Sequence, residues 1–132
     1  ATPHIAGYSF EGKLNGTRMV YEAACRFLGV AASWDANAVL AGNAGPAVEA
    51  DVDGRSPTET LRDVVSQVYP IERDDAALRK TAGWSPADRG REFDRLRKAY
   101  PRRREFRPVT VRIRSAPRTV LTTLERLGFV LW

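Results

Sequence analysis

The chain has 132 residues, 43% of them hydrophobic and 28% charged, which is typical of one soluble globular domain. Its net charge of +5 favours polyanionic or acidic partners. The single cysteine, Cys25, excludes an internal disulfide and a multi-thiolate zinc site and favours an intracellular, reducing compartment, cytoplasm or organelle matrix. No apolar run approaches the roughly 20 residues of a membrane span, and the first ten residues lack the pattern of a secretory signal.

The N-terminal half predicts a strand over residues 4–10 and then a helix within residues 15–29. Thr17 is the expected N-cap of this helix, and Gly29 is expected to end it. Four apolar residues are expected on one face of this helix (Val20, Ala24, Phe27 and Leu28). A weaker pattern over 35–41 indicates a short helical turn, a Gly-rich loop follows at 41–46, and residues 47–52 predict a strand.

Two of the expected helices begin with a Ser-Pro pair. Ser56 precedes a helix with Glu59 in the capping-box position, and Pro70 ends it. Ser85 caps another helix that ends before Pro101. A further helix spans residues 117–127, a weaker helical pattern lies at 74–81, and the charged residues 72–75 predict a surface loop.

Residues 107–114 alternate between apolar and polar and predict a strand, and residues 128–132 predict a buried C-terminal strand. Strands and helices in this order favour a single α+β domain over residues 1–132. We expect a small, mostly antiparallel sheet of three to four strands with helices packed on one face.

The acidic stretch at residues 49–53 is a weak candidate for a metal site, because Glu49, Asp51 and Asp53 share strand parity. A calcium loop starting at Glu49 would need a bidentate Glu at its twelfth position, where Thr60 stands. We favour a polar strand face that leads into the Ser56 cap, and we predict no metal and no cofactor.

Other catalytic templates also fail. The only histidine, His4, lies in the N-terminal segment, and Cys25 is expected to be a small buried residue rather than a thiolate nucleophile. The glycines at 7, 12 and 16 do not have the spacing of a phosphate-binding loop and are expected in turns. The sequence therefore favours a nonenzymatic protein.

Arginine is concentrated in the second half. Residues 1–66 carry five Lys/Arg against eight Asp/Glu, a net −3, whereas residues 67–132 carry sixteen against eight, a net +8. Arginine binds phosphates and carboxylates through two parallel hydrogen bonds, and aromatic residues among the arginines can stack on bases. The candidate binding residues are Arg102, Arg103, Arg104, Arg107, Arg112, Arg114, Arg118, Tyr100 and Phe106. A solvated loop with a charged sheet face remains an alternative interpretation.

The C-terminal stretch resembles one helix–strand segment of the GTP cyclohydrolase feedback regulatory protein. The resemblance rests on Pro117, Arg118, Val120, Leu121, Leu124, Glu125, Gly128 and Phe129. It implies a strand-helix-strand order and nothing about activity or sites.

The leading hypothesis is a basic accessory protein within a larger assembly, whose arginines contact nucleic acid, RNA in preference to DNA, or an acidic protein. One alternative is a protein-only accessory subunit of an organellar complex with other protein subunits. The other is a small metal-dependent enzyme or ligand-binding domain that uses the acidic strand face.

Overall fold

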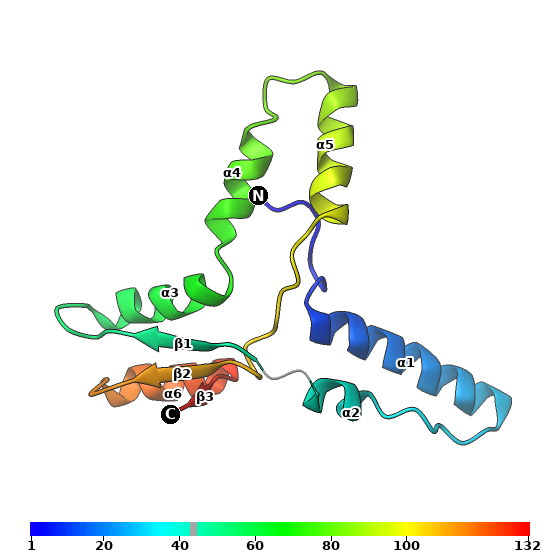
Figure 1. The fold of residues 1–132 in the computed structure, drawn as a ribbon, viewed down its shortest axis with the longest axis horizontal. Coiled ribbons are helices and arrows are strands. Elements are labelled where there is room, and N and C mark those ends of the chain that lie inside the picture. The colour runs from blue at the N-terminus through cyan, green and yellow to red at the C-terminus, as the bar shows by residue number, and fades with distance from the viewer. Residues whose placement is uncertain (43–44) are drawn as a thin grey trace.

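The computed structural model describes residues 1–42 and 45–132. Six helices and three strands lie within these residues (Figure 1). The helices are α1 (Phe10–Leu28), α2 (Ala36–Ala41), α3 (Pro57–Val68), α4 (Ile71–Arg79), α5 (Pro86–Lys98) and α6 (Arg118–Leu127), and the strands are β1 (Ala47–Ala50), β2 (Thr110–Ile113) and β3 (Val130–Leu131).

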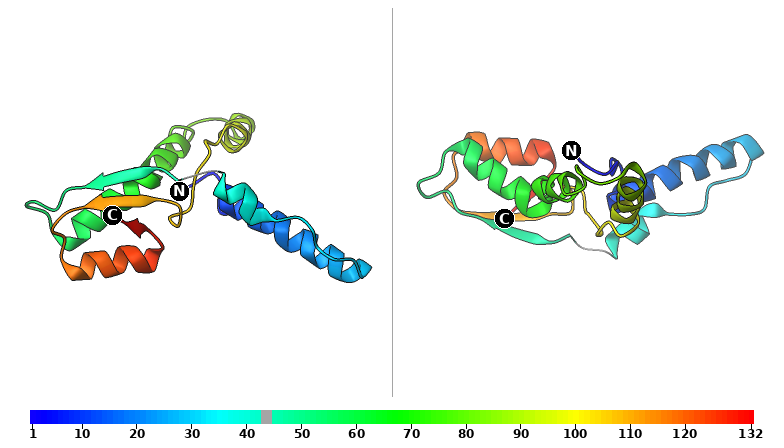
Figure 2. Two further views of the ribbon diagram at one scale, coloured as in Figure 1. Left: turned by 60° about the horizontal axis from the view of Figure 1, so that its bottom comes forward. Right: turned by 90° about the horizontal axis from the view of Figure 1, so that it is seen from above.

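The sheet is parallel throughout, with β2 in the centre between β1 and β3. Val48 pairs with Val111, and Val111 pairs with Leu131. Helices α3 and α6 lie side by side on one face of the sheet (Figure 2). The α+β class fits in broad terms, but the predicted antiparallel sheet is wrong, because long helical connections return the chain to the same end of the sheet each time.

The hydrophobic core lies between the sheet and these two helices. Its buried residues come from the strands, α3, α6 and the flanking loops: Val48, Val64, Val109, Val111, Val120, Leu124 and Phe129. Phe106 stacks on Phe129 with a centroid distance of 4.5 Å, and Gly45 has no room for a side chain because a Cβ would lie 1.7 Å from the Pro108 carbonyl oxygen.

The Ser-Pro helix starts are confirmed. In α3, Ser56 Oγ accepts from the Glu59 amide, and the Glu59 carboxylate accepts from the Ser56 amide at 2.8 Å, so both halves of the capping box form. In α5, Ser85 Oγ accepts from the Asp88 amide. The predicted helix over 117–127 is also confirmed as α6, which ends at Gly128 in the left-handed conformation.

Several local predictions are wrong. The predicted strand over residues 4–10 is a pair of turns with a single bridge from Ser9 to Arg103, because His4 and Gly7 have positive φ. Ser9, not Thr17, caps α1. The charged residues 72–75 lie inside α4 instead of forming a loop. The predicted loop at 41–46 includes residues 43–44, which lie outside the described residues.

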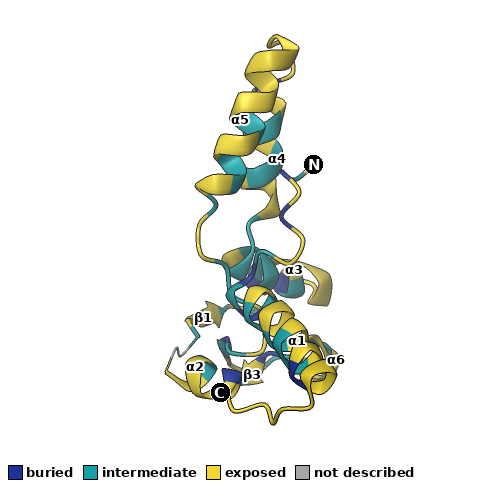
Figure 3. Cartoon of the chain, turned by 90° about the vertical axis from the view of Figure 1, so that its right-hand side faces the viewer, coloured by how far each residue is buried: buried dark blue, intermediate teal, exposed yellow. Residues whose placement is uncertain are grey.

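Helices α1 and α5 extend away from the sheet and are exposed over most of their length (Figure 3). The apolar residues predicted to share one face of α1 are exposed, with Phe27 89% and Val20 72% accessible. Residues 1–42 and 45–132 contain no helix with the length and apolar character of a membrane span. The prediction that residues 1–132 form a single domain is not tested by this arrangement and stays a prediction.

Candidate functional site

The only histidine lies at the surface on a tightly turned segment. His4 is exposed between two buried neighbours, Pro3 and Ile5, and its backbone has the left-handed φ of 56°. The Tyr8 amide donates to the Ile5 carbonyl at 2.9 Å, and Gly7 also has a left-handed φ. Non-glycine residues adopt this conformation rarely, and such residues concentrate at functional sites.

Tyr8 brings two cations close to this segment. Arg97 of α5 donates from Nη2 to the Tyr8 hydroxyl at 3.0 Å, and the Lys13 ammonium lies 4.4 Å from the Tyr8 ring centroid. The Arg97 Nε is buried without a hydrogen-bond partner. Neither cation forms an ion pair with a carboxylate among residues 1–42 and 45–132. An anion could therefore bind these two cations without displacing a carboxylate of the described residues.

A buried polar cluster lies directly after this segment. Ser9 is 1% and Glu11 7% exposed. Ser9 Oγ donates to Glu105 Oε1 at 2.7 Å, and Arg104 Nε donates to Glu11 Oε1 at 2.5 Å. The second Glu11 oxygen accepts from the Glu105 amide at 2.9 Å. Burial acts to raise the pKa of Glu11, but the hydrogen bonds from the Glu105 amide and Arg104 outweigh it and leave the pKa below its usual value.

Two tyrosines share one carboxylate beside this cluster. Asp74 Oδ2 accepts from the Tyr100 hydroxyl at 2.8 Å and from the Tyr69 hydroxyl at 3.2 Å. Burial first, and then the hydrogen bond and charge of Asp74, raise the pKa of Tyr100; burial and Asp74 also raise the pKa of Tyr69. Both hydroxyls therefore stay protonated near neutral pH and tie α4 to the segment after α5.

The arginines predicted to form one surface are divided among several parts of the molecule. Arg102 stacks over Phe10, Arg103 over Tyr69, and Arg104 pairs with Glu11. Arg112 contacts Glu49 at 3.8 Å and lies over the Trp132 ring. The others are exposed around the connector, the end of β2 and the start of α6: Arg107, Arg114 and Arg118. The structure does not gather the set into one surface.

The two predicted stacking aromatics have internal partners. Phe106 packs on Phe129 against the core. Tyr100 meets the Tyr8 ring edge-on with a centroid distance of 6.1 Å, and its hydroxyl binds Asp74. Both rings therefore hold the fold together.

The acidic stretch does not keep strand parity, because β1 ends at Ala50. Asp51 Oδ1 accepts from the Asp53 amide at 2.9 Å in a turn, and Glu49 faces Arg112. The described residues contain no group of three or more His, Cys, Asp or Glu that could hold a metal ion.

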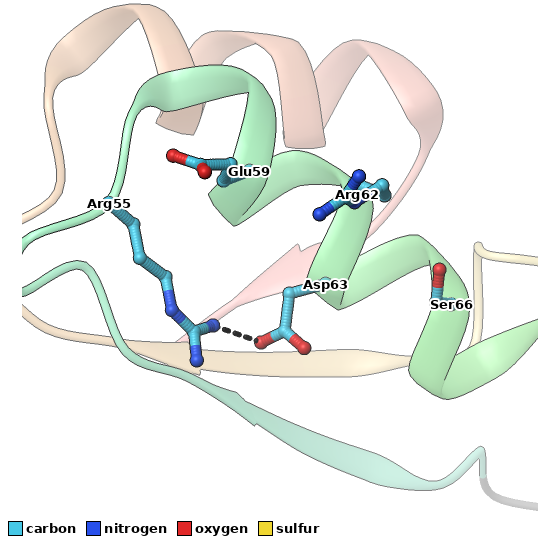
Figure 4. A pocket seen from close by; sticks show the side chains of 5 residues that line it. All are labelled: Arg55, Glu59, Arg62, Asp63 and Ser66. Carbon is cyan, nitrogen blue, oxygen red and sulfur yellow. Dashed lines mark hydrogen bonds and ion pairs between the residues drawn. The ribbon is translucent and has the colours of Figure 1, made fainter.

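A surface hollow at the start of α3 carries its own charge pairs (Figure 4). Arg55 Nη1 pairs with Asp63 Oδ2 at 2.8 Å, and Glu59 is part of the capping box. These contacts stabilise the start of the helix, and we assign no chemistry to the hollow.

Most of the residues that lie together around the N-terminal segment were not predicted as site residues from the sequence. The signal for His4 is that a sole histidine follows a Thr-Pro pair, and the contacts of Glu11 and Arg97 have no sequence signal. Their partners lie 94 and 89 positions away in the chain.

Curated relatives match almost the entire chain. The erythronate-4-phosphate dehydrogenase of Marinobacter nauticus is 39% identical over 99% of this chain and 34% of its own length. The protein of that name from Cellvibrio japonicus is 41% identical over 97% of this chain and 34% of its length, and that from Teredinibacter turnerae is 48% identical over 80% and 27%. The chain thus spans about a third of these relatives.

These relatives overturn the leading hypothesis from the sequence. They are named as enzymes, and nothing in the comparisons supports a nucleic-acid partner. The prediction of a nonenzymatic accessory protein that contacts RNA or an acidic partner is therefore wrong. The prediction was based on the number of arginines, and this number gives the charge of the chain but not which arginines have partners inside the protein.

Residues 44–128 match a family described as a domain of unknown function (DUF3410). The match covers β1 and β2, the helices α3 and α6 that pack on the sheet, and helices α4 and α5. It leaves the His4 segment, α1, α2 and β3 outside. Because the match includes more than half of the residues, the chain belongs to the DUF3410 family.

Proposed function

We propose that the chain is one part of a longer erythronate-4-phosphate dehydrogenase. The observation that supports this most is the identity of 39–41% with proteins of that name along 97–99% of the chain. The similarity extends from the DUF3410 region through the His4 segment. We also infer an intracellular, reducing location, which a single cysteine supports.

His4 is the proposed acid–base residue. Oxidation of a hydroxyl group removes a hydride from carbon and a proton from oxygen, and the proton needs a nearby acceptor. An imidazole is suited to accept this proton at neutral pH. His4 is exposed and is held between two buried residues in a defined turn, which supports this role.

Arg97 and Lys13 are the proposed contacts for the phosphate of the substrate. Both lie against Tyr8, four residues after His4, and Arg97 retains a buried Nε without a partner. A guanidinium and an ammonium together suit a phosphate dianion. Four residues span at most about 14 Å, so the imidazole and the two cations belong to one short segment of the chain and its neighbours.

A dehydrogenase also requires an acceptor for the hydride. The glycines at 7, 12 and 16 do not have the spacing of a nucleotide phosphate loop. We therefore assign no residue of this chain to such an acceptor and expect the remaining two-thirds of the enzyme to bind it.

The first test is the activity of the longer protein that contains this chain. The wild-type protein should oxidise erythronate 4-phosphate under the conditions used for the Marinobacter nauticus enzyme. His4→Gln should lower kcat by about 10²–10⁴-fold, with folding unchanged by circular dichroism, because the proton then lacks its acceptor. A wild-type protein without activity beside an active relative would refute the proposed function.

The phosphate contact is tested separately. Arg97→Met should raise KM for erythronate 4-phosphate by about tenfold or more, since a charge-assisted hydrogen bond contributes about 1.5–3 kcal/mol. The matched control is Arg95→Met on the same helix, because Arg95 is paired with Glu92 on the surface. Equal KM values for the two variants would exclude Arg97 from the phosphate site.

A further inference from the structure

We propose that Arg104 is a positioning residue for His4, acting through its buried ion pair with Glu11 and the adjoining Ser9–Glu105 hydrogen bond. These contacts would lock the His4 segment to the DUF3410 region so that the imidazole keeps its place. The inference rests on the proposed function for its catalytic consequence, but the locking itself can be observed without any activity.

The contacts are short and numerous for two segments far apart in the chain. The Arg104 and Glu11 side chains are only 12% and 10% exposed. Both oxygens of Glu11 are occupied, one by Arg104 Nε and one by the Glu105 amide. The Phe10 amide also donates to the Arg103 carbonyl at 2.8 Å, beside the bridge from Ser9 to Arg103. The start of α1 is thus fixed to residues 103–105 through side chains and backbone.

Residues 103–105 are themselves attached to the core. The next residue, Phe106, stacks on buried Phe129, and the chain then enters β2 at the centre of the sheet. The Val109 amide donates to the Phe106 carbonyl at 2.9 Å. The contacts of Ser9 and Glu11 with residues 103–105 therefore connect the His4 segment to the hydrophobic core.

Short contacts connect the turn before Ser9 to the start of α1. Ser9 Oγ accepts from the Gly12 amide, and a Cβ on Gly12 would lie 2.7 Å from that oxygen and 3.1 Å from the Gly7 carbonyl oxygen. Gly7 is in the left-handed conformation, and Ile5 is 2% exposed. Because Ile5 and Ser9 are buried on either side of this turn and the Gly7 carbonyl lies close to Gly12, we expect a displacement at Ser9 and Glu11 to be passed on to His4, five residues before Ser9.

The geometry of proton transfer is sensitive to small displacements. A misplacement of about 1 Å can lower the rate about 10²-fold. Substitution of a residue that only positions the imidazole is therefore expected to change kcat and to leave the binding of substrate nearly unchanged. An Arg104 variant should therefore differ from an Arg97 variant, which is expected to change KM.

The kinetic experiment uses Arg104→Met in the longer protein. We expect kcat to fall by about 10–10²-fold with KM nearly unchanged. Arg104→Lys, which keeps the charge, should recover part of kcat and serves as the reporting variant if Arg104→Met does not fold. The matched control is Arg55→Met, which breaks the exposed ion pair with Asp63 and should keep wild-type kinetics. Wild-type kcat in a folded Arg104 variant would overturn the proposal.

The imidazole resonance of His4 gives a readout besides activity. It is assigned by its loss in His4→Gln. We expect it to shift or broaden in the Arg104 variants and to stay unchanged in Arg55→Met. If the wild-type protein is inactive but this resonance responds, the proposed function fails while the positioning role stands. An unchanged resonance in folded Arg104 variants overturns the positioning role whatever the activity.

Discussion

Glu11 shows how one buried carboxylate can hold two distant segments together. An isolated buried carboxylate would be costly, but each oxygen of Glu11 has a donor, and one of these donors is charged. Breaking such a pair leaves the remaining charge buried and unpaired. The neighbouring residues Ser9 and Glu105 add a neutral–charged hydrogen bond at 2.7 Å. The ion pair of Glu11 with Arg104 is therefore expected to contribute most of the stability of this contact between the two segments.

The pH dependence of stability should reveal this carboxylate. The folded-state pKa of Glu11 lies below its ordinary value of 4.5, so its stabilising contribution is fully present above pH 4.5 and is lost as the pH falls through the lower folded-state pKa. We expect the free energy of unfolding of the wild type to fall more steeply below pH 4.5 than that of Glu11→Gln. Urea titrations at several pH values measure this, and parallel curves for the two proteins would contradict it.

Among the elements, α3 has the most complete set of local signals. Pro57 supplies the first helical residue, Ser56 and Glu59 cap each other's amides, and Val64 faces the core. The opposite case is α1, whose apolar face is exposed although its sequence favours packing. Periodicity predicts that a helix forms and which side is apolar, but it does not tell what covers that side.

Removing the α3 cap should have a measurable cost. Ser56→Ala removes the acceptor for the Glu59 amide and should lower the free energy of unfolding by about 1 kcal/mol. Thr58→Ala, at an exposed position two residues further along the same helix, is the control and should change little. Chemical denaturation measures both, and an equal loss for the two variants would show that the capping box does not stabilise the helix.

At the scale of the whole molecule, a small parallel sheet carries the core, and the other helices extend from it. Both faces of a parallel sheet are usually covered. Here α3 and α6 cover one face (Figure 2), so a short sheet with few core residues depends strongly on each of them. Leu124 of α6 is fully buried in that core, whereas Leu127 on the same helix is 43% exposed.

Truncation of these two leucines should therefore have unequal effects. Leu124→Ala leaves a cavity and should lower the free energy of unfolding by about 2–5 kcal/mol. Leu127→Ala removes the same atoms from a half-exposed site and should cost clearly less. The urea midpoints of the two variants test where the core lies. Similar losses in the free energy of unfolding would contradict this placement.

Much of the local structure could be predicted from the sequence, but little of the candidate site could. The Ser-Pro starts of α3 and α5 and the stop at Gly128 depend on neighbours within a few residues, so the sequence contains them. His4 could have been singled out as the sole histidine. The contacts around it could not be predicted, because Glu11 and Arg97 bind partners about 90 positions away in the chain. No local pattern in a single sequence indicates such pairs.

By itself, the sequence determined the capped helices and the central strand, because capping and alternation are interactions between near neighbours. The tertiary structure alone decided that the strands run parallel and that Arg103 and Arg104 turn inward onto Tyr69 and Glu11. It also decided that Arg97 lies against Tyr8 close to His4. Strand direction and the partner of a charged side chain depend on where distant segments return, and only the folded chain sets that.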